Sequence, residues 1–139
     1  MTPISTGKKT YEIPFDNGDK CILRFNPTDY RFYLKFTALK KVVSDILVEF
    51  EDKRKKVTGK AEEELYDRSE AEIKAAFDDV FGEGAGDQIF KHCSPLSLVD
   101  SEIYYPFYFI DAFAPEIVGT INERAQKSAE RAKEYKESK

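Results

Sequence analysis

Residues 77–90 read FDDVFGEGAGDQIF, in which an apolar helical pattern is interrupted by three glycines and then resumes. Phe77, Val80 and Phe81 fall on one face of a helix. Glycine adopts backbone conformations that other residues rarely reach, and it is common just past the C-terminus of a helix. The stretch therefore predicts a corner between two helices rather than a catalytic loop.

The helix before this corner is predicted to run from about residue 60 to residue 81. The acidic run Glu62–Glu64 suits a helix N-terminus, where the helix dipole is positive. The polar middle of this helix, residues 67–72, is expected to be exposed. Its apolar side comprises Leu65, Ile73, Phe77 and Val80.

A longer helix is predicted over residues 28–56, between the capping side chains of Asn26–Asp29 and the break at Gly59. Its apolar seam recurs at alternating spacings of four and three residues. The stripe is wider than a two-stranded coiled coil needs, so it suits a globular bundle or a groove for a partner. The seam comprises Phe32, Phe36, Leu39, Val43, Ile46 and Phe50, thickened by Tyr33, Val42 and Leu47.

Residues 11–25 are predicted to form a β-hairpin, because apolar and polar residues alternate on both sides of the turn signal Asn17-Gly18. Pro14 lacks a backbone donor, so the first strand is expected at a sheet edge or with a bulge. Two strands alone are only marginally stable. The hairpin is therefore expected to pack on helices or to add to the sheet of another chain.

The last third of the chain is predicted to be helical from Ser94-Pro95 onward, with Pro106 kinking or interrupting the helix. At Pro115 two alternatives stay open: a bent helix continues, or a new helix starts in register. Large apolar residues are lost from residue 124 onward, so residues 124–139 are predicted to form a charged, frayed helical tail.

The chain has 139 residues, of which 41% are hydrophobic and 35% are charged, and these values are typical of a globular protein. This length suits one domain. We expect an α+β fold, in which an N-terminal β-hairpin packs on a mainly helical bundle of three to four helices. A flexible N-terminus is expected over residues 1–10 and the single domain over residues 11–123.

The net charge of −4 and the sequence pI of about 5.2 do not favour nucleic acid or an anionic membrane as a partner. The basic run Lys53–Lys56 follows the acidic residues Glu49, Glu51 and Asp52, and it is interpreted as a solvated helix end. The first residues lack the apolar core of a secretion signal, and no apolar run approaches the length of a membrane span. We expect a protein that is not secreted and that binds neither nucleic acid nor membrane.

The chemical motifs do not favour a catalytic site. The single histidine, His92, precedes Cys93, but sequence neighbours rarely meet at hydrogen-bonding geometry and no third orienting group is identifiable. Cys93 and Cys21 are isolated, which does not indicate a disulfide framework or a zinc knuckle. The glycines of residues 82–86 follow a helix and enclose Glu83, which repels phosphate. We expect a non-enzymatic protein with no catalytic residue, cofactor or metal.

Residues 104–109 read YYPFYF, so aromatic side chains point around a helix and one packed face cannot hold them all. Exposed Tyr and Phe are common at protein interfaces. This aromatic block and the wide seam of the first long helix therefore predict an interaction surface. Its candidate residues are Phe32, Phe36, Leu39, Val43, Tyr104, Tyr105, Phe107, Tyr108 and Phe109.

The chain resembles the small tail assembly chaperones of long-tailed (siphovirus-type) bacteriophages and prophages of Gram-positive bacteria. The resemblance covers roughly residues 11–121, and its most distinctive part is the corner AFDDVFGEG at residues 76–84. Cys93, Ser94-Pro95 and the prolines at 106 and 115 depart from the family pattern. The other matching features are the hairpin before a long helix, Ile89-Phe90, and an aromatic helix with Tyr104, Phe107, Phe109 and Ile110.

The resemblance implies a non-enzymatic viral protein of the host cytoplasm that coats the long, aggregation-prone tape-measure protein and helps recruit tail-tube subunits. Its partners would be the tape-measure and tail-tube proteins, with self-association of neighbouring copies through the edge hairpin. The alternative is a phage-encoded inhibitor of a host defence system, such as an anti-CRISPR. Carboxylates such as Glu62–Glu64 would then mimic nucleic-acid phosphate.

Overall fold

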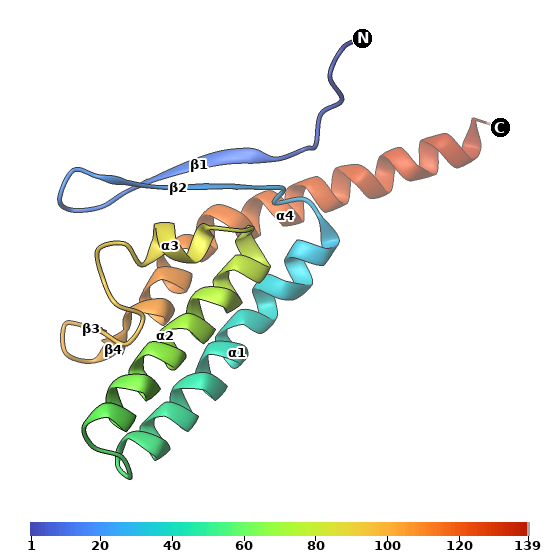
Figure 1. Cartoon of the computed structure of the whole chain (residues 1–139). Helices are drawn as coiled ribbons and strands as arrows, with labels where there is room; N and C mark the ends of the chain where they lie inside the picture. The colour runs from blue at the N-terminus through green and yellow to red at the C-terminus, as the bar shows by residue number, and fades with distance from the viewer. Residues whose placement is uncertain (139) are drawn as a thin grey trace.

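The computed structural model describes residues 1–138, which form an N-terminal β-hairpin lying across a bundle of helices (Figure 1). This arrangement confirms the predicted α+β fold. The elements are β1 (Lys9–Pro14), β2 (Lys20–Phe25), α1 (Tyr30–Arg54), α2 (Lys60–Phe81), α3 (Ala85–Ile89), β3 (Leu98–Val99), β4 (Ile103–Tyr104) and α4 (Tyr105–Glu137).

The β1–β2 hairpin closes at the predicted Asn17-Gly18 turn. The N–H of Gly18 donates to the C=O of Phe15, and Gly18 has a φ of 89°, a left-handed conformation that glycine adopts without strain. The strand begins at Lys9, two residues before the predicted boundary. Pro14 ends β1 opposite Lys20 in this two-stranded sheet, as expected for an edge strand.

Helices α1 and α2 form a pair that packs side by side over most of its length (Figure 1). The side chain of Asp29 caps α1 by accepting a hydrogen bond from the N–H of Arg31, and α2 has the predicted bounds, residues 60 to 81. The polar middle of α2 is only partly exposed as predicted, because Ser69 is buried. Ser69 shares the buried side of α2 with Leu65 and Ile73.

The predicted corner after α2 is present. Gly82 and Gly84 have φ values of 105° and 86°, and Gly84 immediately precedes the short helix α3. The Asp78 carboxylate accepts a hydrogen bond from the N–H of Gly86 at 2.6 Å, which fixes the start of α3 on the last turn of α2. The glycines therefore turn the chain from α2 into α3 at a corner, as their positions predict.

The predicted helix start at Ser94-Pro95 is wrong. This region instead forms a short hairpin, in which Leu98 pairs with Tyr104 and Val99 pairs with Ile103. The long helix α4 begins only at Tyr105, with Pro106 in its first turn. Pro106 does not kink a helix. The N–H groups of the first turn have no acceptor within the helix, so a proline there removes no helical hydrogen bond.

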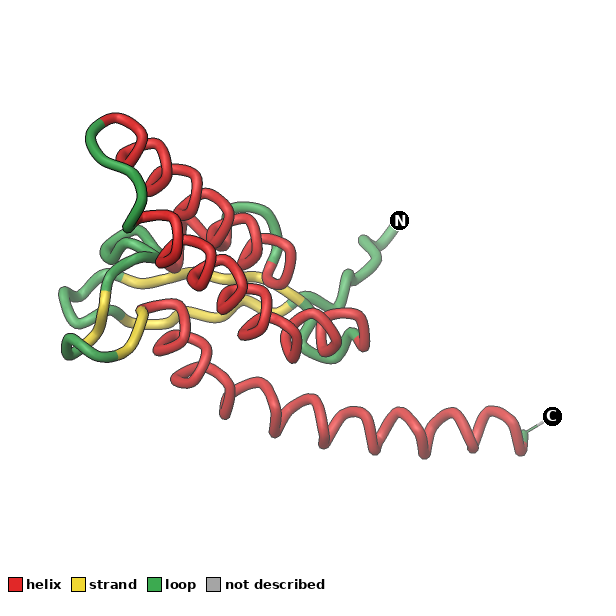
Figure 2. Tube along the Cα trace, turned by 90° about the horizontal axis from the view of Figure 1, so that it is seen from below, coloured by secondary structure: helices red, strands yellow, loops and turns green. Residues whose placement is uncertain are grey.

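Helix α4 runs continuously through Pro115, which settles the open alternative in favour of one continuing helix. Its second half extends away from the body of the fold (Figure 2). Within the predicted tail, residues 124–137 are helical and almost all are exposed, while Lys139 lies outside the described residues. The predicted fraying of the tail stays a prediction.

The core lies where the hairpin crosses the helices. Phe25 of β2 stacks on Phe32 of α1 at a centroid distance of 4.7 Å, and its ring also meets Phe81 of α2 edge-on at 5.2 Å. Phe113 of α4 meets both Phe25 and Phe81. These aromatic contacts join the hairpin to α1, α2 and α4, so the hairpin is an integral part of the fold.

Candidate protein-binding site

The four candidate residues of α1 lie in the core. Phe32, Phe36, Leu39 and Val43 are all at most 7% exposed. The hairpin covers the start of this stripe through Phe25, and α2 covers the rest. Of the residues that widen the seam, Leu47 is buried, whereas Tyr33 and Val42 are exposed. The four candidate side chains therefore do not form a surface for a partner.

The aromatic block at residues 104–109 is divided between the core and the surface. Tyr105 and Phe109 are buried, and Phe107 is half-buried. The hydroxyl of Tyr104 donates a hydrogen bond to the carboxylate of Glu51 on α1. Burial and this hydrogen bond raise the pKa of Tyr104 to about 12. The described structure leaves Tyr108 as the one strongly exposed member of the block, so the nine candidates are not brought to one surface.

A groove of about 350 Å³ lies between β1 and the first half of α4. Tyr11 of β1 contacts both neighbouring elements: its ring stacks on Phe25 of β2 at a centroid distance of 4.8 Å and meets Phe113 of α4 edge-on at 5.5 Å. Of the predicted residues it includes Phe109. The remaining lining was not singled out from the sequence, and comprises Tyr11, Glu12, Ile13, Pro14, Ala112, Phe113 and Glu116.

The wall formed by β1 carries backbone groups that β2 does not use. In an antiparallel pair, opposed residues alternate between hydrogen-bonded and non-hydrogen-bonded pairs. The N–H of Phe15 donates to the C=O of Asp19 at 2.8 Å, so Ile13–Cys21 and Tyr11–Leu23 are the next hydrogen-bonded pairs in the register. Thr10, Glu12 and Pro14 therefore direct their backbone groups away from β2, toward the outer edge of β1.

The opposite edge of the hairpin is closed by side chains from and just after α3. The Oε1 atom of Gln88 accepts a hydrogen bond from the N–H of Ile22 at 3.1 Å. The Nζ atom of Lys91 donates to the C=O of Lys20 at 2.6 Å. In the part of the chain that the structure describes, no comparable bond reaches the outer backbone groups of Thr10 and Glu12. The two edges therefore differ, and β1 is the open one.

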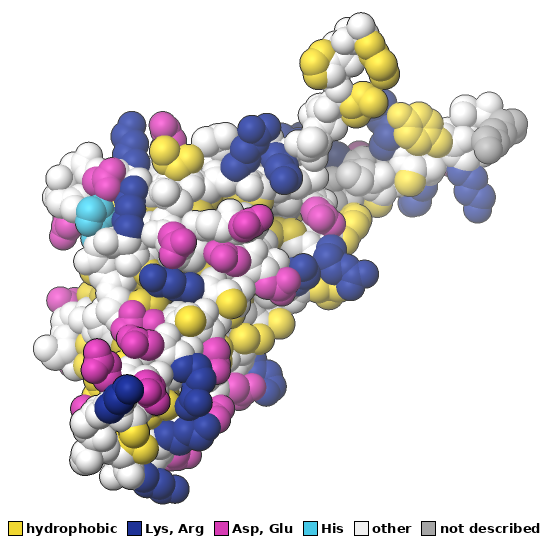
Figure 3. All heavy atoms as spheres, in the orientation of Figure 1, with side chains coloured by type: hydrophobic (Ala, Val, Ile, Leu, Met, Phe, Trp, Pro, Cys, Tyr) yellow, Lys and Arg dark blue, Asp and Glu magenta, His cyan; other side chains and the backbone are white. Residues whose placement is uncertain are grey.

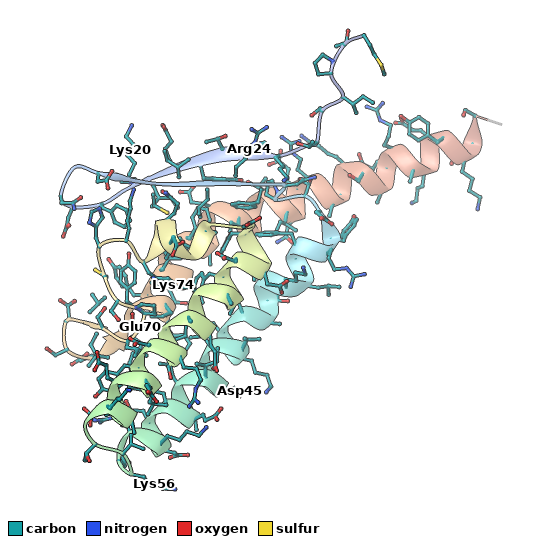
Figure 4. The ribbon with its side chains drawn as sticks, in the orientation of Figure 1. Lys20, Arg24, Asp45, Lys56, Glu70 and Lys74 are labelled. Atoms are coloured by element: carbon teal, nitrogen blue, oxygen red, sulfur yellow. The ribbon has the colours of Figure 1, made fainter. Side chains whose placement is uncertain are left out.

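Acidic groups stand at the rim of the groove. Glu116 of α4 lines it, and burial together with the charge of Glu116 raises the pKa of Tyr11. The Glu12 carboxylate lies on the outer face of the hairpin, 3.8 Å from the Nζ of Lys20. Figure 4 shows the Lys20 side chain pointing away from the helices. The groove thus combines an apolar floor and an open strand edge with two carboxylates, those of Glu12 and Glu116, among its lining residues.

His92 contacts the hairpin turn. The Nε2 atom of His92 lies 2.7 Å from Oδ2 of Asp19 in the hairpin turn, and its ring meets Phe15 edge-on. Cys93 is exposed, whereas Cys21 is buried, and this burial raises the pKa of the Cys21 thiol to about 11. His92 therefore fixes the loop after α3 to the hairpin.

The acidic run at the start of α2 does not form a uniformly negative surface. Lys53, Lys56 and Arg68 line the same shallow hollow as Glu64. Basic and acidic side chains are interspersed over the α1–α2 face in Figure 3. A surface that mimics nucleic-acid phosphate needs one dominant sign of charge. This part of the molecule gives no specific support to the inhibitor alternative.

Neither a metal-binding cluster nor a membrane-spanning helix is present within residues 1–138. No group of three or more His, Cys, Asp or Glu side chains in this range is arranged to hold a metal ion. No helix in it is long and apolar enough to cross a membrane. Comparison of the chain with protein-family models, curated proteins and solved structures gives no match in any of the three.

Proposed function

We propose that this chain is a non-enzymatic, protein-binding assembly chaperone of a bacteriophage or prophage tail. It would act in the host cytoplasm on the tape-measure protein and help recruit tail-tube subunits. The observation that carries the proposal is the groove beside β1, where an open strand edge borders an apolar floor. A chaperone needs such a surface to hold an apolar segment of its client away from water.

The resemblance of the corner at residues 76–84 to tail assembly chaperones supports the choice of client. The extended second half of α4 gives further support, because its exposed, mixed-charge surface adds solubility to a complex with an aggregation-prone chain. The groove and this helical extension come from opposite halves of α4, so client binding and solubility would be supplied by separate parts of one helix.

Coexpression with the neighbouring genes tests the proposal. The DNA that flanks this gene is sequenced, and the long helical reading frame next to it is expressed with and without this chain. We expect the tape-measure protein to be insoluble alone and to become soluble and co-purify when the chain is present. A chain with Ala112→Glu, which places a charge in the groove, is expected to lose this effect.

The matched control is Val118→Glu, which introduces the same charge at an exposed apolar position of α4 outside the groove. This variant is expected to keep the client soluble. Flanking DNA without tail genes, or a tape-measure protein whose solubility does not depend on the chain, would contradict the proposal. In that case the inhibitor alternative is tested by binding to host nucleases.

A further inference from the structure

We propose that the groove binds its partner as an added β-strand: an extended segment with apolar side chains at alternate positions and Lys or Arg between them. The inference deepens the function proposed above and rests on it for the identity of the client. It specifies the backbone conformation and the chemistry of the segment that is recognised.

The backbone of β1 specifies the conformation of the occupant. Thr10 and Glu12 each present an N–H and a C=O at the outer edge, and Pro14 presents a C=O. These groups repeat at every second residue, which matches the hydrogen-bonding period of a strand and not that of a helix. An extended segment paired with β1 in a single register would form hydrogen bonds with all of these backbone groups.

The closed edge of β2 supports this reading. Gln88 and Lys91 bond to outward groups of Ile22 and Lys20 and so prevent an added strand there. In the described residues the corresponding positions of β1 have no such cover. Strand addition is therefore directed to one edge, and that edge is the one with an apolar floor beside it.

The floor and rim specify the side chains of the occupant. Successive side chains of a strand point to opposite faces, so every second side chain of an added strand would face Phe109, Ala112 and Phe113. The side chains between them would lie on the outer face beside Glu12, and Glu116 stands at the rim of the floor. Apolar residues are complementary to this floor, and Lys or Arg between them is complementary to the carboxylates of Glu12 and Glu116.

A second copy of this chain fits the same place less well. Two-fold pairing of β1 with β1 would bring the partner's own α4 beneath the shared strands. Residues 109–116 of α4 already floor the space beside β1. A single extended segment occupies that space without a second helix.

The test uses the full chain labelled with ¹⁵N and a short acetylated peptide of sequence Thr-Val-Lys-Val-Thr-Val-Lys-Val-Thr. We expect saturable binding with a Kd at or below about 1 mM. The amides of Thr10 and Glu12 should shift and exchange with solvent at least about tenfold more slowly. The amides of Tyr11 and Ile13, which already bond to β2, should change little.

Two variants of the chain and one altered peptide test which groups the peptide uses. Thr10→Pro removes an outward N–H without removing a hydrogen bond to β2, and it should weaken peptide binding by about tenfold. Arg24→Pro makes the same change at the residue paired with Thr10 on β2, and it should leave binding unchanged. Replacing both lysines of the peptide by glutamate should also weaken binding by about tenfold.

The outcomes separate the two proposals. Absence of peptide binding, equal effects of Thr10→Pro and Arg24→Pro, or β1 pairing between copies of the chain would overturn strand addition. If the tape-measure protein is solubilised but the amides of Thr10 and Glu12 exchange as in the free chain, the chaperone function stands and strand addition fails. If the peptide binds as expected but the tape-measure protein stays insoluble, the function fails and strand addition stands.

Discussion

Gly86 lies so close to Lys74 that a side chain on this glycine has no room. A Cβ atom at Gly86 would be 2.6 Å from the carbonyl oxygen of Lys74 and 2.9 Å from its Cα. The contact is between backbones, so no flexible side chain can move aside. It allows α3 to pack directly on α2 and brings Gln88 to the edge of β2.

Gly86→Ala should therefore destabilise the fold by about 1–3 kcal/mol, because the two helices must move apart. Gly119→Ala is the matched control: this glycine is helical and exposed, and nothing lies within 4 Å of an added Cβ. The control should stabilise the protein by up to about 1 kcal/mol through helix propensity. Urea unfolding followed by circular dichroism measures both, and equal effects of the two changes would refute this account of α3 packing.

The predicted bounds agree best with the structure where glycine lies on both sides of an amphipathic helix. Gly59 and Gly82 flank α2, and its predicted bounds agree with the structure. The prediction failed at residues 94–104, because Leu96, Val99 and Ile103 are spaced three and four residues apart, as in a helix. Strand pairing across Asp100 and Ser101 replaces that helix, and a turn without glycine gave no warning of it.

The candidate site was harder to predict than the fold. Alternation in the first strand and Pro14 indicated an edge strand. The sequence does not show that a groove lies beside this edge, because the groove depends on where α4 lies in space. The register that turns Thr10 and Glu12 outward follows from the Phe15–Asp19 hydrogen bond. The central seam of α1 makes apolar contacts as predicted, but the sequence does not distinguish a partner from the chain's own hairpin and α2, and Tyr33 and Val42 at the edge of the seam are exposed.

The β3–β4 turn contains two residues in the left-handed region, Asp100 with a φ of 56° and Ser101 with a φ of 61°. The N–H of Glu102 donates to the C=O of Val99 across this turn. Side chains with a Cβ are strained there, and glycine is not. Ser101→Gly should raise stability by about 0.5–1 kcal/mol, whereas Ser128→Gly, in exposed helix, should lower it by about 0.5 kcal/mol. Thermal unfolding of both variants decides whether the strain is present.

The Tyr104 hydroxyl joins the start of α4 to the second half of α1 through Glu51, which also accepts a hydrogen bond from Nε of Arg54 at 2.8 Å. The hydrogen bond from Tyr104 is the main reason that the pKa of Glu51 is lowered. Tyr104→Phe should cost about 1 kcal/mol of unfolding free energy and raise the pKa of Glu51. Tyr135→Phe removes an exposed hydroxyl and should change neither quantity. Carboxyl titration by NMR and urea unfolding provide the two measurements.

The Asp19 carboxylate joins the hairpin turn to the loop after α3, with Nε2 of His92 at 2.7 Å and Nζ of Lys91 at 3.1 Å. The hydrogen bond with His92, followed by those with the Lys20 N–H and Lys91, lowers the pKa of Asp19 below its usual value. The unfolded chain therefore takes up this proton first, at about pH 3.9. The stability contributed by Asp19 is present above that pH and is lost as the pH falls toward the folded-state pKa.

Asp19→Asn should therefore make stability depend less on pH in the acid range. Its Tm should fall less between about pH 5 and pH 2 than that of the unchanged protein. Because the carboxylate is exposed, about 1 M NaCl should shrink the acid-dependent fall in the unchanged protein more than in the variant. Tm measured across this pH range at low and high salt tests both statements. Parallel Tm profiles for the two proteins would mean that the link between Asp19, Lys91 and His92 does not stabilise the attachment of the hairpin.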